Sequence, residues 1–247
     1  MTEVRRSPAE EPLRHVQVSP ASQDGSARLR ARRGPWLVPL GLIALSAVPI
    51  LAGSLRLVEL SGGAAILPAE LASPLPLAVH IVTASVYSVL GAFQFAAGFR
   101  RRRPGWHRAA GRLLVVFGLA VALSALWLTA FTPRPDGSGE VYHLFRLFFG
   151  STMLLSIALG FRAIRRQDVI RHRAWMIRAY AIALAAGAQV FTLGIGEAIV
   201  GKGDTSSALL AGAGWVINLA VAEWVIRRRP TVTRGVAAGR ARAPRLR

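Results

Sequence analysis

Six apolar runs, each as long as a membrane-spanning helix, dominate this chain of 247 residues. A helix needs about 20 predominantly apolar residues to cross the hydrocarbon core of a bilayer, and it satisfies its own backbone groups there. The runs that meet this length are 36–58, 77–99, 108–131, 144–164, 173–200 and 206–226. The sequence therefore predicts an all-α, polytopic membrane protein with six transmembrane helices.

The basic residues are distributed unevenly between the two ends of these runs. Twenty-seven of the 31 lie in the N-terminal tail, the 99–112 loop, the 161–178 loop and the C-terminal tail, and only four lie at the opposite ends. Connections rich in arginine and lysine stay in the cytoplasm. The distribution predicts that both termini are cytoplasmic.

Composition excludes several classes of protein and site. The net charge of +19 would suit a nucleic-acid-binding protein, but the arginines flank apolar runs, so no nucleic-acid partner is expected. Cysteine is absent, which excludes disulfides, thiolate metal sites, iron–sulfur clusters and attached c-type haem. The ends of the chain, 1–33 and 230–247, are polar and rich in arginine. We expect them to be disordered tails around a transmembrane domain at 34–229.

Four histidines occupy matched positions at the starts of the middle four runs. His80 and His143, 63 residues apart, begin the second and fourth runs on the outer side. His107 and His172, 65 residues apart, begin the third and fifth runs on the inner side. The spacing suggests a two-helix unit used twice. Asp168 is expected to cap the helix that carries His172, because its carboxylate can accept from the free N–H groups of the first turn.

The four histidine-bearing helices are expected to form a four-helix core bundle, in which alternate helices are diagonal neighbours. Histidines at the same depth then face each other, and two opposed imidazoles can ligate a haem iron axially. The pattern suggests haem b, with iron bound by the outer pair and by the inner pair, in a protein for transmembrane electron transfer. Two alternatives stay open: a non-redox small-molecule transporter or channel, and a structural membrane subunit. Enzymatic activity is left open.

Several charged and polar side chains accompany the histidines. Arginine can bind a haem propionate or an anionic substrate through paired N–H donors. The candidates are Arg146, near the outer surface, and Arg108, Arg112, Arg173 and Arg178 on the inner side. Glu197, Asn218 and Glu223 lie in or near the spans, and Glu223 is expected to pair with Arg227, four residues later on the same helix.

Three stretches carry a resemblance to a known family. They are RRRRPGWHRAAGR at 100–112, RRQDVIRHRAWMIRAYA at 165–181 and WVINLAVAEW at 215–224. The chain resembles the bacterial membrane proteins grouped as domain-of-unknown-function family 2306, which implies a multi-pass protein of the bacterial cytoplasmic (inner) membrane, with the lipid bilayer as its partner. The helix and histidine layout is also similar to the two-haem transmembrane cytochromes b that accept electrons from ascorbate-like donors. That resemblance implies His80 and His143 as outer haem ligands, His107 and His172 as inner ones, and a small-molecule electron donor.

Overall fold

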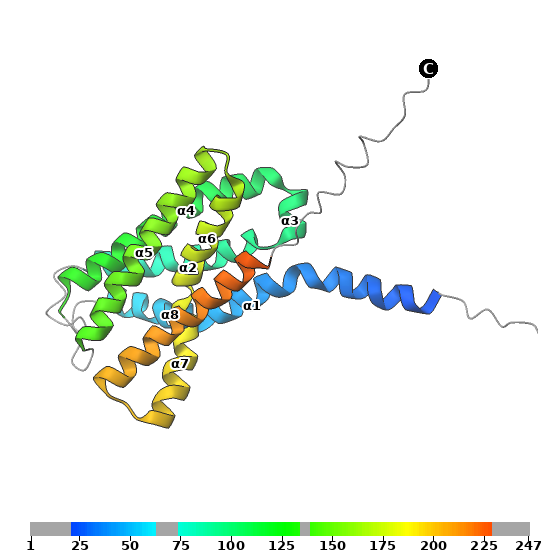
Figure 1. Ribbon diagram of the computed structural model, residues 1–247. Coiled ribbons are helices and arrows are strands. Elements are labelled where there is room, and N and C mark those ends of the chain that lie inside the picture. Colours follow the sequence, from blue (N-terminus) through cyan, green and yellow to red (C-terminus); the bar gives the residue numbers. More distant parts are fainter. Residues whose placement is uncertain (1–20, 63–73, 134–138, 229–247) are drawn as a thin grey trace, which may run out of the picture.

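Helices make up almost all of the described part of the chain. The computed structural model describes residues 21–62, 74–133 and 139–228 (Figure 1). The helices are α1 (Ala21–Ser61), α2 (Leu75–Gln94), α3 (Ala97–Arg102), α4 (Pro104–Phe131), α5 (Glu140–Arg165), α6 (Val169–Ala183), α7 (Ala185–Val200) and α8 (Asp204–Arg227). No strand occurs within these ranges, in agreement with the predicted all-α fold.

Among the described residues, five helices are long and apolar enough to cross a membrane, and the bent pair α6 and α7 makes a sixth span when counted as one. The five are α2, α4, α5, α8 and the part of α1 at Trp36–Ser61. Each overlaps a run predicted from the sequence. The prediction of a polytopic membrane protein is therefore confirmed.

The predicted single helix at 173–200 is bent by 43° where α6 meets α7. The hydrogen bonding tightens there, because the Gly187 N–H donates to Leu184 O, three residues back, at 3.0 Å. Gly187 also lies so close to α1 that a Cβ on it would come within 2.1 Å of the Leu45 carbonyl oxygen. The bend turns α7 towards α1 and α8, which both contact it. An apolar run alone does not reveal such a bend.

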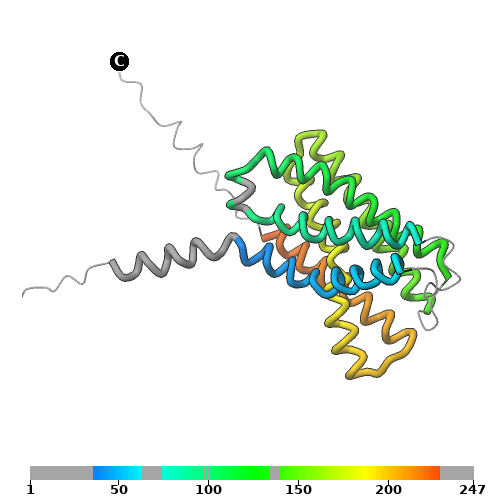
Figure 2. Tube along the Cα trace, turned by 180° about the vertical axis from the view of Figure 1, so that it is seen from behind, coloured from blue at the N-terminus to red at the C-terminus, as the bar shows by residue number. Residues whose placement is uncertain are grey.

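The middle helices form a ring. α2 contacts α4, α4 contacts α5, α5 contacts α6, and α6 returns to α2. α2 and α5 therefore occupy opposite corners, as do α4 and α6, which is the diagonal arrangement expected of a four-helix core. α1 packs against α2 and α7, while α8 lies against α5, α6 and α7 (Figure 2).

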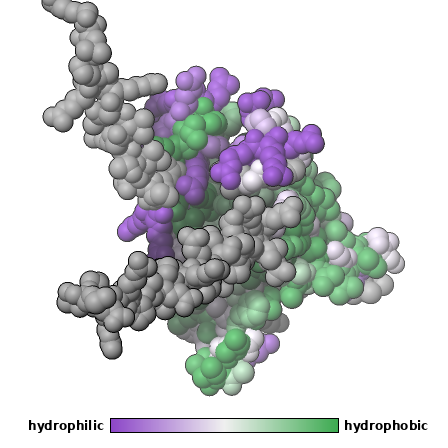
Figure 3. Space-filling view, turned by 90° about the vertical axis from the view of Figure 1, so that its right-hand side faces the viewer, coloured by the Kyte–Doolittle hydropathy of each residue, from purple (hydrophilic) through white to green (hydrophobic). Residues whose placement is uncertain are grey.

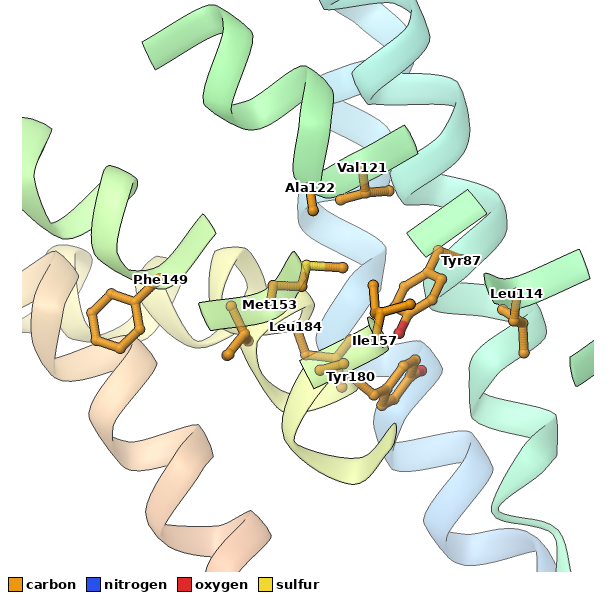
Figure 4. Close-up of a cluster of buried hydrophobic side chains, with 11 residues drawn as sticks. Tyr87, Leu114, Val121, Ala122, Phe149, Met153, Ile157, Tyr180 and Leu184 are labelled. Carbon is orange, nitrogen blue, oxygen red and sulfur yellow. The ribbon is translucent and has the colours of Figure 1, made fainter. Parts of the chain in front are cut away.

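Two tyrosines mark the centre of the bundle (Figure 4). The ring centroids of Tyr87 and Tyr180 lie 5.8 Å apart. The Tyr180 hydroxyl donates to Ser88 O at 2.6 Å, which matters because a buried hydroxyl without a partner is costly. Gly91 makes room for this ring, since a Cβ there would come within 2.3 Å of a Tyr180 ring carbon. The ring of helices is thus closed by aromatic packing around one satisfied hydroxyl.

The surface is apolar along the flanks of the helices and basic at one end. Leu55, Phe131 and Ile199 are 67%, 68% and 77% exposed, and an exposed apolar surface of this kind indicates contact with lipid. The arginine-rich connections before α4 and between α5 and α6 lie on the same side of the bundle (Figure 1). Figure 3 shows hydrophilic side chains gathered apart from a broad hydrophobic flank.

The predicted N-terminal tail overlaps the start of α1, and the predicted domain boundaries stay predictions. α1 begins at Ala21, so residues 21–33 of the predicted disordered tail 1–33 are helical. This stretch is rich in alanine and arginine, which are good helix formers. It also continues the helix of the membrane span, and extending an existing helix is easier than starting a new one. Residues 1–20 and the predicted C-terminal tail 230–247 lie outside the described residues.

Candidate small-molecule site

A cavity of about 560 Å³ lies inside the bundle. Residues of α1, α2, α4, α5 and α8 line it, together with both sides of the α6–α7 bend. Most of its wall is apolar with a few polar side chains, which is typical of ligand pockets, whose volumes run from about 300 to 1,000 Å³. The polar side chains on the wall that could bind a ligand through hydrogen bonds or charge include those of His80, Tyr142, Arg146 and Gln189.

His80, on the second turn of α2, is held by a serine of α4. His80 Nδ1 lies 3.0 Å from Ser124 Oγ. The serine hydroxyl has one proton, and Ser124 Oγ donates it to Ala120 O at 2.6 Å. With its proton on Ala120 O, Ser124 accepts from the ring, and this bonding assigns the His80 hydrogen to Nδ1. In the neutral ring the other nitrogen, Nε2, then has a free lone pair and is an acceptor.

Arg146, on the second turn of α5, brings a positive charge to the same cavity. Its guanidinium carbon lies 5.9 Å from the centroid of the Tyr142 ring. Within the described ranges the salt bridges leave Arg146 without a carboxylate partner. By contrast, Arg56, also at the outer side, has Glu59 at 2.6 Å. Arg146 thus brings a guanidinium to the cavity wall.

Aromatic and amide groups also line the cavity. Trp215 of α8 lines the cavity and stacks on Phe149, with ring centroids 4.8 Å apart and planes 13° apart. Gln189 of α7 donates from Nε2 to Ala211 O at 3.0 Å, which leaves its side-chain oxygen as an acceptor. The cavity therefore combines a flat apolar wall with a guanidinium and an imidazole.

The predicted histidine pairs are not brought together by this cavity. Among the described residues its wall includes His80 but not His143, which lies half-buried on the first turn of α5. His172 Nδ1 donates to Gly160 O at 2.8 Å and so joins α6 to α5. His107 lies half-buried on the first turn of α4, at the opposite corner of the ring from α6. The described residues hold no group of three or more metal-ligating side chains. Both haem pairings stay predictions.

The connection between α5 and α6 is short and capped. Asp168 Oδ1 accepts from the Arg171 N–H at 3.0 Å, which confirms the predicted cap and places His172 in the first turn of α6. Gln167, just before the cap, has a φ of 60°, a left-handed conformation that a tight turn requires. The inner histidine is thus held by local structure at the basic end.

The other candidate arginines lie at that basic end. Arg108 and Arg112 are exposed on α4, and Arg173 is half-buried on α6. Arg178 Nε donates to Glu223 Oε1 at 2.5 Å and so links α6 to α8. Arg178 is therefore already paired, and its predicted anion-binding role, like that of the other three, stays a prediction.

The three intramembrane polar residues noted in the sequence join helices to one another. Glu223 Oε2 lies 3.7 Å from Arg227 Nε, as predicted, in addition to its bond with α6. Asn218 donates to a carbonyl of α6 at 3.1 Å. Glu197 accepts from the Ser207 hydroxyl across the α7–α8 hairpin. All three bonds position α8 or α7, and none of the three side chains lines the cavity.

The family model described as "Predicted membrane protein (DUF2306)" matches residues 77–226. This segment covers more than half of the chain. The chain belongs to the DUF2306 family. No curated protein and no solved structure matches it, so the similarity to two-haem cytochromes b rests on the helix and histidine layout alone.

The DUF2306 segment contains the polar side of the cavity. His80, Ser124 and Arg146 lie within it, whereas α1 precedes it. The sequence singled out His80 and Arg146 but not Ser124. A serine in a membrane helix commonly donates to the carbonyl four residues back, as Ser124 does. Its contact with His80 therefore could not be recognised from the sequence.

Proposed function

We propose that this DUF2306 protein binds a small organic anion in the cavity and carries it across the membrane, as a non-redox transporter. The observation that carries the proposal is the Arg146 guanidinium on the cavity wall without a carboxylate partner among the described residues. A charged side chain in a membrane span is costly, and such residues usually face a cavity and mark a substrate or ion path. An anion in the cavity supplies the missing counter-charge.

The bent span supports the same function. In many transporter folds the substrate site lies beside a discontinuous helix. Here Ile182, Leu184 and Gly187, on both sides of the bend, line the cavity. A bend at the binding site allows α7 to move relative to α6 without breaking a regular helix. It is therefore a suitable place for access to change from one side to the other.

We further propose that the protein lies in the bacterial inner membrane with both termini in the cytoplasm. The support is the arginine distribution, since basic connections remain in the cytoplasm. His80 and Arg146 lie near the starts of α2 and α5, at the ends away from those connections. The cavity is therefore in the half of the bundle nearer the outer face.

Thermal unfolding in lipid nanodiscs tests anion binding. The full-length protein in zwitterionic lipid is heated with a panel of small carboxylates and with inorganic phosphate. A ligand at 100 times its Kd adds about 2.7 kcal/mol to the free energy of unfolding, so at least one anion should raise the midpoint. Nanodiscs containing an anionic lipid separate a free anion from a lipid headgroup. If that lipid alone raises the midpoint and the free anions add nothing, the transport proposal is wrong.

Paired variants then locate the site. Arg146→Gln removes the cavity cation and should abolish both the midpoint shift and anion uptake into proteoliposomes. Arg112→Gln removes an arginine exposed on α4 and should leave both unchanged. Equal responses of the two variants would contradict the assignment of Arg146.

Haem b binding for electron transfer is the second candidate. The observation in its favour is His80, whose Nδ1–H bond to Ser124 leaves Nε2 available, as in metal-ligating histidines whose second nitrogen is held by a neighbour. One histidine on the wall does not make the two-ligand site expected from the sequence, and we derive no electron-transfer step from it. An absorption spectrum of the purified protein decides: a reducible Soret band supports haem, and a colourless protein rules it out.

A further inference from the structure

His80 lines the cavity, and its hydrogen bonds assign its tautomer. With the single hydroxyl proton of Ser124 on Ala120 O, the His80 hydrogen is assigned to Nδ1. The ring bonds Ser124 Oγ and the Val121 backbone, both of which accept from Nδ1–H in this tautomer, so Nε2 is the acceptor left for a guest. A guest that satisfies this nitrogen must bring a hydrogen-bond donor.

The rest of the wall defines the other parts of such a guest. The Arg146 guanidinium matches a carboxylate, because its planar donors suit two oxygens at once. Trp215, Met153 and Ile81 supply an apolar surface, which matches a hydrocarbon or aromatic body. One end of the cavity ligand is thus anionic, one substituent is a donor, and the remainder is apolar.

We infer that the ligand is a hydroxycarboxylate with an apolar body, its carboxylate on Arg146 and its hydroxyl donating to His80 Nε2. This inference rests on the proposed anion site and names its ligand class. His80 is then the residue that makes the protein bind hydroxy acids more tightly than acids without a hydroxyl. A simple acid leaves Nε2 unbonded and loses that hydrogen bond.

Two acids that differ only in the hydroxyl test the inference. The Kd of 3-phenyllactate and that of 3-phenylpropionate are measured by calorimetry on the full-length protein in zwitterionic nanodiscs. One hydrogen bond predicts about threefold to tenfold tighter binding of the hydroxy acid. Equal affinities would refute the role of His80 while leaving the anion site intact. If neither acid binds, or if inorganic phosphate binds more tightly than both, the anion site itself is not a carboxylate site and the inference falls with it.

Variants of α2 separate recognition from folding. His80→Asn keeps an N–H near the position of Nδ1 for Ser124 but has no Nε2, so the ratio of the two Kd values should fall to about one. Thr83→Val removes a hydroxyl that donates to Val79 O and does not line the cavity, so the ratio should stay at the wild-type value. Should His80→Asn not fold, His80→Leu, which has neither a donor nor an acceptor, serves instead. A ratio unchanged in the histidine variant would overturn the inference.

Discussion

Gly187→Ala perturbs the contact between α1 and α7 at a place where neither helix can yield easily. A Cβ at Gly187 would lie 2.1 Å from the carbonyl oxygen of Leu45, which is backbone, and 2.9 Å from its side chain. Real Cβ atoms essentially never approach another heavy atom closer than 3.0 Å. The two helices must therefore separate by at least 0.9 Å, the difference between 3.0 and 2.1 Å.

The expected cost follows from that separation. Overpacking of a well-packed contact costs about 1–3 kcal/mol, partly offset by the helix propensity of alanine, about 1 kcal/mol better than glycine. Gly194→Ala is the matched control, because it lies on the same helix and a Cβ there meets nothing within 4 Å. Gly194→Ala gains the same helix propensity without a steric clash against a neighbouring helix. Gly187→Ala should thus be less stable than Gly194→Ala by about 1–3 kcal/mol.

Reversible unfolding in mixed detergent micelles, with rising mole fraction of sodium dodecyl sulfate and followed by tryptophan fluorescence, measures this difference. Circular dichroism at the start of each titration shows whether both variants are folded. Because Gly187 also lines the cavity, its variant should weaken anion binding as well. If both alanine variants have the same stability, α1 does not pack on α7 through Gly187, and our account of that contact is wrong.

Three further predictions concern topology and the basic end. A reporter active only in the cytoplasm, fused after Arg229, should work, and one active only outside it should be silent; the opposite result would reverse the orientation. Asp168→Ala should destabilise the fold by about 1 kcal/mol in the same detergent titration by removing the cap of α6, whereas Asp168→Asn, which can still accept, should cost less; equal losses would argue against capping. A double-mutant cycle of Arg178→Gln and Glu223→Gln should give a coupling of about 0.5–3 kcal/mol, because the two side chains are in contact; a coupling of zero would place the pair apart.

The fold was largely predictable because bilayer thickness fixes the length of an apolar run. Each predicted span overlaps an observed helix or helix pair, and arginine marks the ends. The bend at Leu184 was not predictable, because residues 173–200 form one long apolar run, whereas the close approach of Gly187 to α1 beside the bend depends on how the helices pack.

The sequence named His80 and Arg146 as candidates but did not place them on one cavity. His80 was chosen for its matched position in the two-helix repeat, and Arg146 because it follows His143 by three residues near the outer surface. Their meeting on one cavity depends on how α2, α5 and α8 pack, which sequence spacing does not reveal. The spacing instead suggested His80 with His143, since the two are at corresponding positions of two similar hairpins. Ser124, which sets the tautomer of His80, has an ordinary sequence context.

The position of α1 relative to the family segment has a consequence for the cavity. The match begins at residue 77, but Ser46, Pro49, Ile50 and Gly53 of α1 form one wall of the cavity. Replacing or removing the first helix of this chain would leave His80 and Arg146 in place, while the cavity changed in width or opened sideways to lipid. The chemistry of the guest would then be set by the shared segment and its size by the helix before it.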